Sequence, residues 1–416
     1  MASPSNKPAR TQASLRLAQI SSHLQPPSTP KMVSTQAPHS LTLIPGPVEF
    51  SDGVLTAMAT PSQSHVSPAF VEVFSETLQL LRKLFRSTDP AAQGFVVAGS
   101  GTLGWDFVAS NLVEPGEDVL VLHTGYFADS FADCIETYGG KPTQLGAPVG
   151  GRPSLEAIAA ALKEKSYKAV TITQVDTSTG VLSDVKAIAE TVKAVSPETL
   201  IIVDGVCSVA CENIEFDAWG LDLVLTAPQK AIGCPTGLAI FFTSARALAT
   251  FQARKAPAGS YYASFKRWLP VMEAYEGKKG AYFSTPPVQS IHALRAALLE
   301  ITSESLDERF AKHAAASDKV KAGIAALGLK QLAPVVEEQA HGMTAAYLPE
   351  GIAAAQVLPL MAKRDITIAG GLHKGIATTY IRIGHMGVSA LEAGRGDLDK
   401  VLAALKESLA ELGYSN

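Results

Sequence analysis

Two residues that can do chemistry stand beside apolar segments in the middle of the chain. Asp204 closes the run Leu-Ile-Ile-Val-Asp, and Lys230 follows a second apolar run, 26 residues later. A lysine can form a Schiff base, whereas a carboxylate at the end of an apolar strand is costly unless a positive group faces it. A protonated pyridine nitrogen is such a group, so the pair suits pyridoxal phosphate chemistry. Lys230 would then carry the cofactor and move a proton, and Asp204 would hold the ring nitrogen.

A glycine-rich segment, residues 99–104, supplies a candidate phosphate site. It has the spacing Gly-x-Gly-x-x-Gly, which dinucleotide-binding folds also use. Those folds place a carboxylate at the end of the next strand, but residues 123–125 contain none. An NAD-dependent dehydrogenase is therefore only a remote alternative. Backbone N–H groups at a helix start, with the hydroxyls of Ser100 and Thr102, suit a single phosphate, and a plain tight turn is the other interpretation.

Two further strand ends offer contacts to a flat ring. Phe127 or Tyr126 could stack on it, and Thr177 could hydrogen-bond a ring oxygen. Each has an ordinary structural alternative, because aromatic side chains also cover cores and the threonine segment could simply lead into a helix capped near Asp184. Gln229, beside the lysine, could reach the phosphate.

The arrangement of apolar runs predicts the elements that position these residues. Short runs rich in β-branched residues recur at 95–98, 118–122, 169–173, 200–204, 221–226 and 238–242. Helical spacing lies between several of them, at 155–165 and 185–196. Strands that alternate with helices predict an α/β fold with a mostly parallel sheet covered on both faces.

After these runs the order of expected helices and strands changes, which predicts a smaller α+β domain. Helices are expected at 289–303, 304–327 and 397–412, and short strands near 343–347, 366–369 and 379–383. We expect four parts: a leader (1–38), an arm that lines the site (39–60), a large cofactor-binding domain (61–298) and a small C-terminal domain (299–416).

Composition limits the function classes. The chain has 416 residues, is 47% hydrophobic and carries a net charge of −4. Its lysines and arginines are scattered, so no nucleic-acid surface is expected. No apolar stretch approaches the ~20 residues of a membrane span, which predicts a soluble protein. The four cysteines indicate a reducing compartment, and Cys207 and Cys211 lack further ligands at metal-binding spacing, so no metal is expected.

The leader has its own pattern. Residues 1–38 contain basic but no acidic residues and are rich in Ser, Thr and Pro. Within them Arg16-Leu17, five spacer residues and His23-Leu24 resemble an N-terminal peroxisomal signal. A mitochondrial presequence is the alternative, and translation from Met32 would give a cytoplasmic form.

Several stretches together give a specific resemblance. They are residues 45–47, 99–102, 176–181, 203–208, 229–231, 282–287 and 380–384. In order and spacing the chain resembles the class V aminotransferases of the fold-type-I pyridoxal phosphate enzymes, close to the alanine–glyoxylate and serine–pyruvate group. The resemblance implies the aspartate-aminotransferase-like fold, with a large domain built on a mostly parallel mixed sheet.

The resemblance also implies site roles. Lys230 matches the Schiff-base lysine and Asp204 the ring-nitrogen carboxylate, which makes them the catalytic pair. Arg382 matches the arginine that clamps the substrate carboxylate, and the Gly46 N–H could assist it. The implied cofactor-binding residues are Ser100, Gly101, Thr102, Phe127, Thr177, Asp204, Gln229, Lys230, Tyr282 and Thr285.

Tyr282 and Thr285 match a pair that reaches the phosphate of the neighbouring subunit, so the resemblance implies a homodimer. Two positions depart from the family pattern. Pro228 stands where many relatives have a serine that can touch the phosphate, and Phe127 stands where many have a tryptophan.

The implied reaction is a ping-pong transamination with amino acid and 2-oxo acid substrates. L-alanine or L-serine would give its amino group to glyoxylate, forming glycine and pyruvate or hydroxypyruvate. A kynureninase-like lyase is the alternative within the same family. A cysteine desulfurase is disfavoured, because it needs a nucleophilic cysteine in the C-terminal half and none follows Cys234.

Overall fold

The computed structural model describes residues 36–415. Its internal contacts separate residues 1–38 from residues 39–416, and the fold below is that of the second unit. The peroxisome-type signal at 16–24 and Met32 lie outside the described residues, so both interpretations stay predictions. No helix in residues 36–415 is long and apolar enough to cross a bilayer, and no potential metal-ligand cluster forms there.

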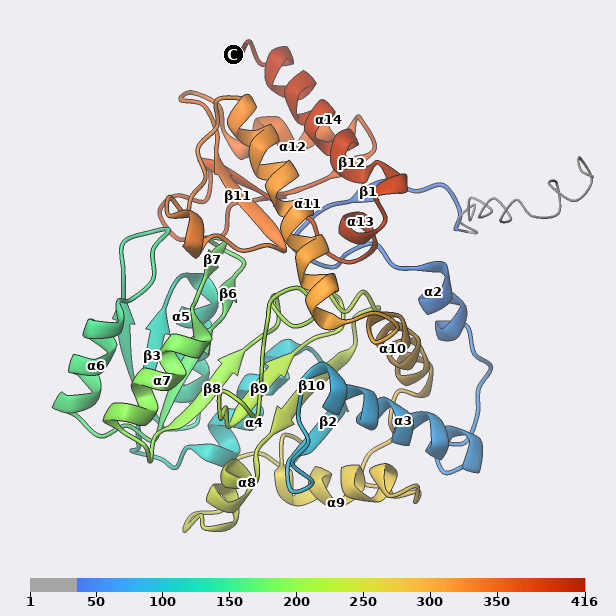
Figure 1. Cartoon of the computed structure of the whole chain (residues 1–416), viewed down its shortest axis with the longest axis vertical. Coiled ribbons are helices and arrows are strands. Elements are labelled where there is room, and N and C mark those ends of the chain that lie inside the picture. The colour runs from blue at the N-terminus through green and yellow to red at the C-terminus, as the bar shows by residue number, and fades with distance from the viewer. Residues whose placement is uncertain (1–35, 416) are drawn as a thin grey trace, which may run out of the picture. The chain divides into compact units, whose positions relative to one another are not determined.

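A seven-stranded sheet forms the centre of this unit (Figure 1). Its strands, in spatial order, are β2 (Gln93–Ala98), β10 (Leu238–Thr243), β9 (Leu223–Thr226), β8 (Leu200–Asp204), β5 (Ala169–Thr173), β3 (Asp118–His123) and β4 (Lys141–Gly146). Only β10 runs antiparallel to its neighbours. The expected mixed, mostly parallel sheet is confirmed. The sequence did not predict β4, because this edge strand has exposed and half-exposed side chains rather than an apolar run.

Helices cover both faces of the sheet. The connections from β2 to β3 and from β3 to β4 run in one direction across it and contain α4 (Gly101–Leu112) and α5 (Tyr126–Thr137). The chain then turns back through α6 (Leu155–Glu164) and α7 (Val185–Val195). Because such crossovers are right-handed, the two pairs lie on opposite faces (Figure 1). The remaining helices of this part are α2 (Asp52–Met58), α3 (Pro68–Leu84), α8 (Ala245–Gln252), α9 (Phe265–Glu276) and α10 (Val288–Ile301).

The C-terminal part builds a second, smaller core. Its antiparallel sheet has the order β11 (Met343–Tyr347), β14 (Tyr380–Gly384), β13 (Ala369–Gly370), and helices α11 (Leu306–Ala326), α12 (Ala354–Ala362) and α14 (Asp397–Glu411) accompany it. The strand β1 (Leu41–Thr42) pairs in parallel with β12 (Ile366–Thr367), which draws the arm into this core. Buried Leu43 belongs to the same apolar cluster as Ile381 and Val401. The four-part domain division stays a prediction.

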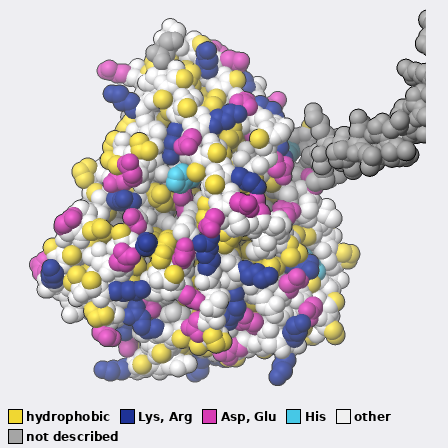
Figure 2. Space-filling view, in the orientation of Figure 1, with side chains coloured by type: hydrophobic (Ala, Val, Ile, Leu, Met, Phe, Trp, Pro, Cys, Tyr) yellow, Lys and Arg dark blue, Asp and Glu magenta, His cyan; other side chains and the backbone are white. Residues whose placement is uncertain are grey.

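Figure 2 shows lysines and arginines interspersed with aspartates and glutamates on the face that it presents, without a broad area of one sign. Nucleic-acid binding normally uses a basic patch or stripe. This face therefore offers no such footprint.

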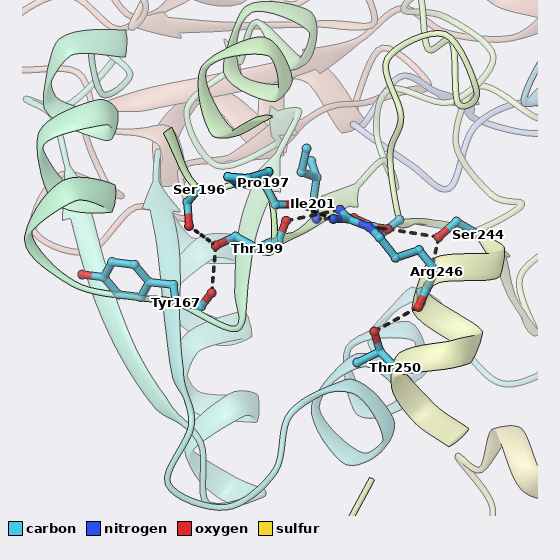
Figure 3. Close-up of polar contacts among 10 residues, drawn as sticks. Tyr167, Ser196, Pro197, Thr199, Ile201, Ser244, Arg246 and Thr250 are labelled. Atoms are coloured by element: carbon cyan, nitrogen blue, oxygen red, sulfur yellow. Dashed lines mark hydrogen bonds and ion pairs between the residues drawn. The ribbon is translucent and has the colours of Figure 1, made fainter. Parts of the chain in front are cut away.

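A polar network at the amino ends of the central strands ties α8 to the sheet (Figure 3). The Asp222 carboxylate is buried and accepts hydrogen bonds from Ile201 N at 2.8 Å, Ser244 Oγ at 3.0 Å and Arg246 Nε at 2.8 Å. Arg246 Nη1 also donates to the Pro197 carbonyl at 2.7 Å. One arginine thus neutralises a buried carboxylate and joins the loop before β8 to the helix after β10.

Replacing this arginine tests how much the network stabilises the fold. Arg246→Met leaves the Asp222 charge buried, so we expect the free energy of unfolding to fall by about 2 kcal/mol, discounted because Arg246 itself is partly exposed. Urea unfolding measures the loss. Arg364→Met is the matched control, since its partners Glu407 and Glu411 are exposed, and it should lose clearly less stability than Arg246→Met. Equal losses in both variants would contradict this assignment.

Candidate active site

The carboxyl ends of six parallel strands share one edge of the central sheet. They belong to β2, β9, β8, β5, β3 and β4. From β3 the chain moves outward to β4, whereas from β5 it moves inward to β8, so the direction of connection reverses between β3 and β5. Ligands in open α/β sheets bind outside such a reversal point. The segments that carry the expected residues 100–102, 127, 177, 204 and 229–230 all follow these strand ends.

Lys230 lies in the connection between β9 and β10, against the N-terminal arm. Its Nζ donates a hydrogen bond to the Pro45 carbonyl. A Cβ at Gly46 would lie 2.2 Å from Lys230 Cδ, so only glycine lets the arm approach this closely. Burial lowers the pKa of Lys230, and Arg382 adds to that effect, while Cys207 and Asp204 oppose it. A lowered pKa favours the neutral amine, which is the nucleophilic form.

Gly46 was expected to offer its N–H to the substrate. In this structure that N–H donates to the Ile44 carbonyl at 2.6 Å, within a tight turn. Its role toward a substrate stays a prediction, and a substrate would have to share or replace this bond.

Asp204 ends β8 and is 3% exposed. Its Oδ2 accepts a hydrogen bond from Trp105 Nε1 at 2.8 Å, and its Oδ1 accepts one from Val206 N at 3.0 Å. Burial raises the pKa of Asp204 to about 6, although both hydrogen bonds and Lys230 lower it. Because each carboxylate oxygen has two lone pairs, Asp204 can still accept a bond from a further donor.

The start of α4 has the properties of a phosphate cradle. Ser100 is its N-cap residue, but the Ser100 side chain makes no capping hydrogen bond, and both Ser100 and Thr102 are exposed. A Cβ at Gly101 would lie 2.8 Å from Val206 Cγ2, so glycine brings the helix start against the segment after Asp204. The half-buried side chain of Gln229 makes no hydrogen bond within the described chain. Free hydroxyls and N–H groups at a helix start suit an anion.

Phe127 and Thr177 are held by two interlocked segments. Asp176 is fully buried and its Oδ2 accepts a hydrogen bond from Phe127 N at 3.2 Å. Ser178 Oγ accepts one from Tyr126 N at 2.9 Å and itself donates to Asp176 Oδ1 at 2.6 Å. The loop after β5 thus caps α5 and fixes its half-buried phenylalanine. Burial raises the pKa of Asp176.

Arg382 reaches this edge from β14 of the smaller sheet. Its Nε donates to the Gly370 carbonyl at 2.7 Å and its Nη1 to the Thr177 carbonyl at 3.0 Å. The guanidinium is thereby fixed beside the Thr177 backbone, and its Nη2 has no hydrogen bond within residues 36–415. Burial lowers its pKa. The free N–H groups on Nη1 and Nη2 form the edge that a carboxylate can bind bidentately.

The comparisons with known proteins decide the family. The sequence matches the family "Aminotransferase class-V" over residues 49–389. The chain belongs to the class V aminotransferases. It is 46% identical over 361 residues to alanine–glyoxylate aminotransferase 1 of Saccharomyces cerevisiae, covering 84% of this chain and 92% of that one.

Two further relatives extend the comparison. Serine–glyoxylate aminotransferase of Arabidopsis thaliana is 29% identical over 89% of this chain and 90% of that one. The crystal structure of an alanine–glyoxylate aminotransferase from Nostoc superposes with a TM-score of 0.82 at 29% identity, over 91% of this chain and 97% of that one. These findings confirm the family, the fold type and the pyridoxal phosphate cofactor that the sequence predicted.

The site of this class V aminotransferase fits pyridoxal phosphate. A half-buried lysine with a lowered pKa is available for a carbonyl group, a buried carboxylate has lone pairs left for a pyridinium N–H, and the uncapped start of α4 can take the phosphate. Phe127 lies at the same edge, where its ring can cover the cofactor. The individual contacts to the cofactor stay predictions.

Tyr282 and Thr285 are both exposed and lie close to each other. Tyr282 is 63% exposed, its hydroxyl is 3.5 Å from Thr285 Oγ1, and its ring centroid is 5.2 Å from that of His65. Neither makes a hydrogen bond to Lys230 or to the start of α4 within the part of the chain that the structure describes. Within the described residues, this pair is therefore not joined to its own chain's site by a hydrogen bond.

Sequence reasoning missed Trp105 and Asp176. Trp105 was not singled out, since an aromatic residue inside an apolar helix is usually core. Asp176 stood in a segment where Thr177 was the expected contact and a lead-in to a helix capped near Asp184 was the alternative. Asp184 does cap α7, by accepting a hydrogen bond from Ala187 N at 3.0 Å. The available signal was the polar cluster Asp-Thr-Ser-Thr directly after an apolar strand.

Arg382→Lys tests the carboxylate clamp of this aminotransferase. Lysine keeps the charge but loses the fork, so we expect KM for both the amino acid and the 2-oxo acid to rise by about tenfold or more, with a smaller change in kcat. Cofactor content should stay normal. Steady-state kinetics with both substrates varied measures the effect, and Arg364→Lys on the surface is the control. A variant with unchanged KM for both substrates would exclude Arg382 as the clamp.

Proposed function

We propose that this protein is a pyridoxal phosphate-dependent aminotransferase that transfers the amino group of L-alanine to glyoxylate, giving pyruvate and glycine. L-serine is the alternative donor, with hydroxypyruvate as its product. The observation that carries the proposal is the meeting of Lys230, Asp204 and Arg382 at one sheet edge in a chain 46% identical to the yeast enzyme named for this reaction. Relatives named for serine and glyoxylate support the shared acceptor.

Each residue of the site has a separate role in the reaction. The cofactor supplies an electron sink for the carbanion at the substrate α-carbon. Arg382 holds the α-carboxylate by its free guanidinium edge, and Lys230 takes the α-proton as a neutral amine. Burial favours that neutral form, and the same burial excludes water, which strengthens the attraction between Asp204 and a protonated ring nitrogen.

Product stoichiometry tests the reaction. Purified protein with L-alanine and glyoxylate should form pyruvate and glycine in equal amounts, with parallel double-reciprocal lines that indicate a ping-pong mechanism. With L-alanine alone, turnover should stop after one equivalent. Continued product release without an oxo acid would instead favour the lyase alternative. Replacing L-alanine by L-serine or L-aspartate in the single-equivalent reaction ranks the donors.

We also propose that the active form is a homodimer in which Tyr282 and Thr285 serve the neighbouring site. The support is an exposed aromatic region around the segment before α10. Tyr261 is 71% exposed and Tyr282 63%, and the Tyr261 ring lies 5.5 Å from that of Phe283. Exposed apolar groups of this size are typical of protein interfaces.

Mixing two inactive variants tests this assignment. Lys230→Ala lacks the cofactor lysine, and Tyr282→Ala lacks the contact to the neighbouring phosphate. If Tyr282 acts across the interface, a hybrid dimer contains one site with both native residues. Mixing after subunit exchange should therefore give activity above the sum of the parents, approaching one quarter of the wild-type value if the subunits mix at random. Activity that stays at the parental sum would assign Tyr282 to its own subunit.

We propose a peroxisomal location, supported by the pattern Arg16-Leu17-x5-His23-Leu24. A fluorescent protein fused behind residues 1–38 should enter peroxisomes and should stay outside them when Leu17 and Leu24 are replaced by Ala. Mitochondrial import of the unchanged fusion would favour the alternative.

A further inference from the structure

Trp105 lies in α4 at the position that faces Asp204. Its indole Nε1–H donates to Asp204 Oδ2 at 2.8 Å, and the residue is 6% exposed. The ring lies nearly parallel to that of Phe131, with centroids 5.5 Å apart, and meets Phe127 edge-on at 6.5 Å. Two aromatic side chains of α5 therefore fix the plane of the indole, and with it the direction of its N–H group.

The charged and titratable groups around Asp204 have opposing effects on its ionised form. Asp176, at the end of β6 (Val175–Asp176), repels the Asp204 charge, and Lys230 attracts it. The buried Cys207 thiol also interacts electrostatically with Asp204. Burial is the largest effect and favours the protonated acid. Against it stand the Lys230 charge and two hydrogen bonds, of which only the one from Trp105 comes from a side chain.

We propose that Trp105 is a positioning residue for the transamination: its indole N–H keeps the Asp204 carboxylate ionised and aimed, so that the proton between Asp204 and the cofactor ring nitrogen stays on nitrogen. The inference rests on the proposed pyridoxal phosphate function. A donor to a carboxylate stabilises the charged form over the neutral acid. Proton placement on nitrogen matters, because a positively charged ring withdraws electrons better than a neutral one.

The expected pH dependence follows from the sign of this effect. Asp204 is ionised above its pKa, which burial raises to about 6 in the protein without cofactor. Cofactor affinity should fall as the pH drops through this value, because the ring nitrogen then loses its counter-charge. Removing the indole N–H raises the pKa of Asp204 further. The loss of affinity should then begin at a higher pH than in the wild type.

Trp105→Phe removes the donor and keeps an aromatic ring. Equilibrium dialysis of the apoenzyme with pyridoxal phosphate, between about pH 5 and 8.5, measures the affinity across the transition. We expect Kd at neutral pH to rise by about tenfold and the midpoint of the affinity loss to move up by about one pH unit. In the loaded variant kcat should fall while KM changes little.

Trp268→Phe is the matched control. Trp268 is 2% exposed and its Nε1 donates to the Tyr262 carbonyl at 2.8 Å, so this change also removes one buried indole hydrogen bond. It should lower thermal stability without moving the pH midpoint. A Trp105→Phe protein with the wild-type midpoint, or a control with an equal shift, would show that Trp105 only packs.

Phe131→Leu provides a second measurement if Trp105→Phe folds poorly. It keeps the indole N–H but removes the stacked ring that fixes its direction, so the midpoint should move the same way by a smaller amount. An unmoved midpoint in this variant would also contradict the inference. Wild-type protein that binds no pyridoxal phosphate at any pH would instead overturn the proposed function itself.

Discussion

A carboxylate that the fold buries without a full counter-charge is the constraint on which the site depends. Asp204 is 3% exposed, and within residues 36–415 its carboxylate accepts hydrogen bonds from two N–H donors. Burial raises the pKa of Asp204 and lowers the pKa of the Lys230 amine. The protein without cofactor therefore disfavours the charged form of both groups. Both effects are unfavourable in the empty protein and favourable when a ring with a positive nitrogen and a reactive carbonyl enters. The binding of the cofactor thus relieves the electrostatic cost of the fold.

The surrounding architecture brings backbone close enough to enclose this pair. At Gly46 and Gly101 a single added carbon would collide with Lys230 or Val206, so the arm and the start of α4 reach the site only because no side chain stands between. Arg382 comes from a different sheet: its bond to the Gly370 carbonyl stays within the smaller sheet, and its bond to the Thr177 carbonyl joins the smaller core to the larger one. Substrate binding at this arginine therefore acts on the junction between the two sheets.

The sequence predicted the parts of the fold that depend on local burial and missed those that depend on distant packing. Apolar strands such as residues 200–204 can be recognised from the sequence. Lys230 and Asp204 could be paired in advance because each stands beside such a run and their chemistry is complementary. The exposed edge strand β4 carries no such signal. Asp176 caps a helix that begins 50 residues earlier in the chain, and Trp105 finds its acceptor 99 residues later, so neither partner is visible in a local pattern.

The residues of the site determine the reaction but not the choice of amino donor. Lys230 and Asp204 act on the cofactor, and Arg382 addresses the α-carboxylate, a group that every α-amino acid shares. None of the three can distinguish alanine from serine, and relatives named for each donor belong to the same family. Donor choice must therefore come from residues that face the substrate side chain. A resemblance carried by these three residues therefore identifies the reaction more strongly than the donor. The arm around Gly46, which lies directly against Lys230, is one segment that could contribute to donor choice.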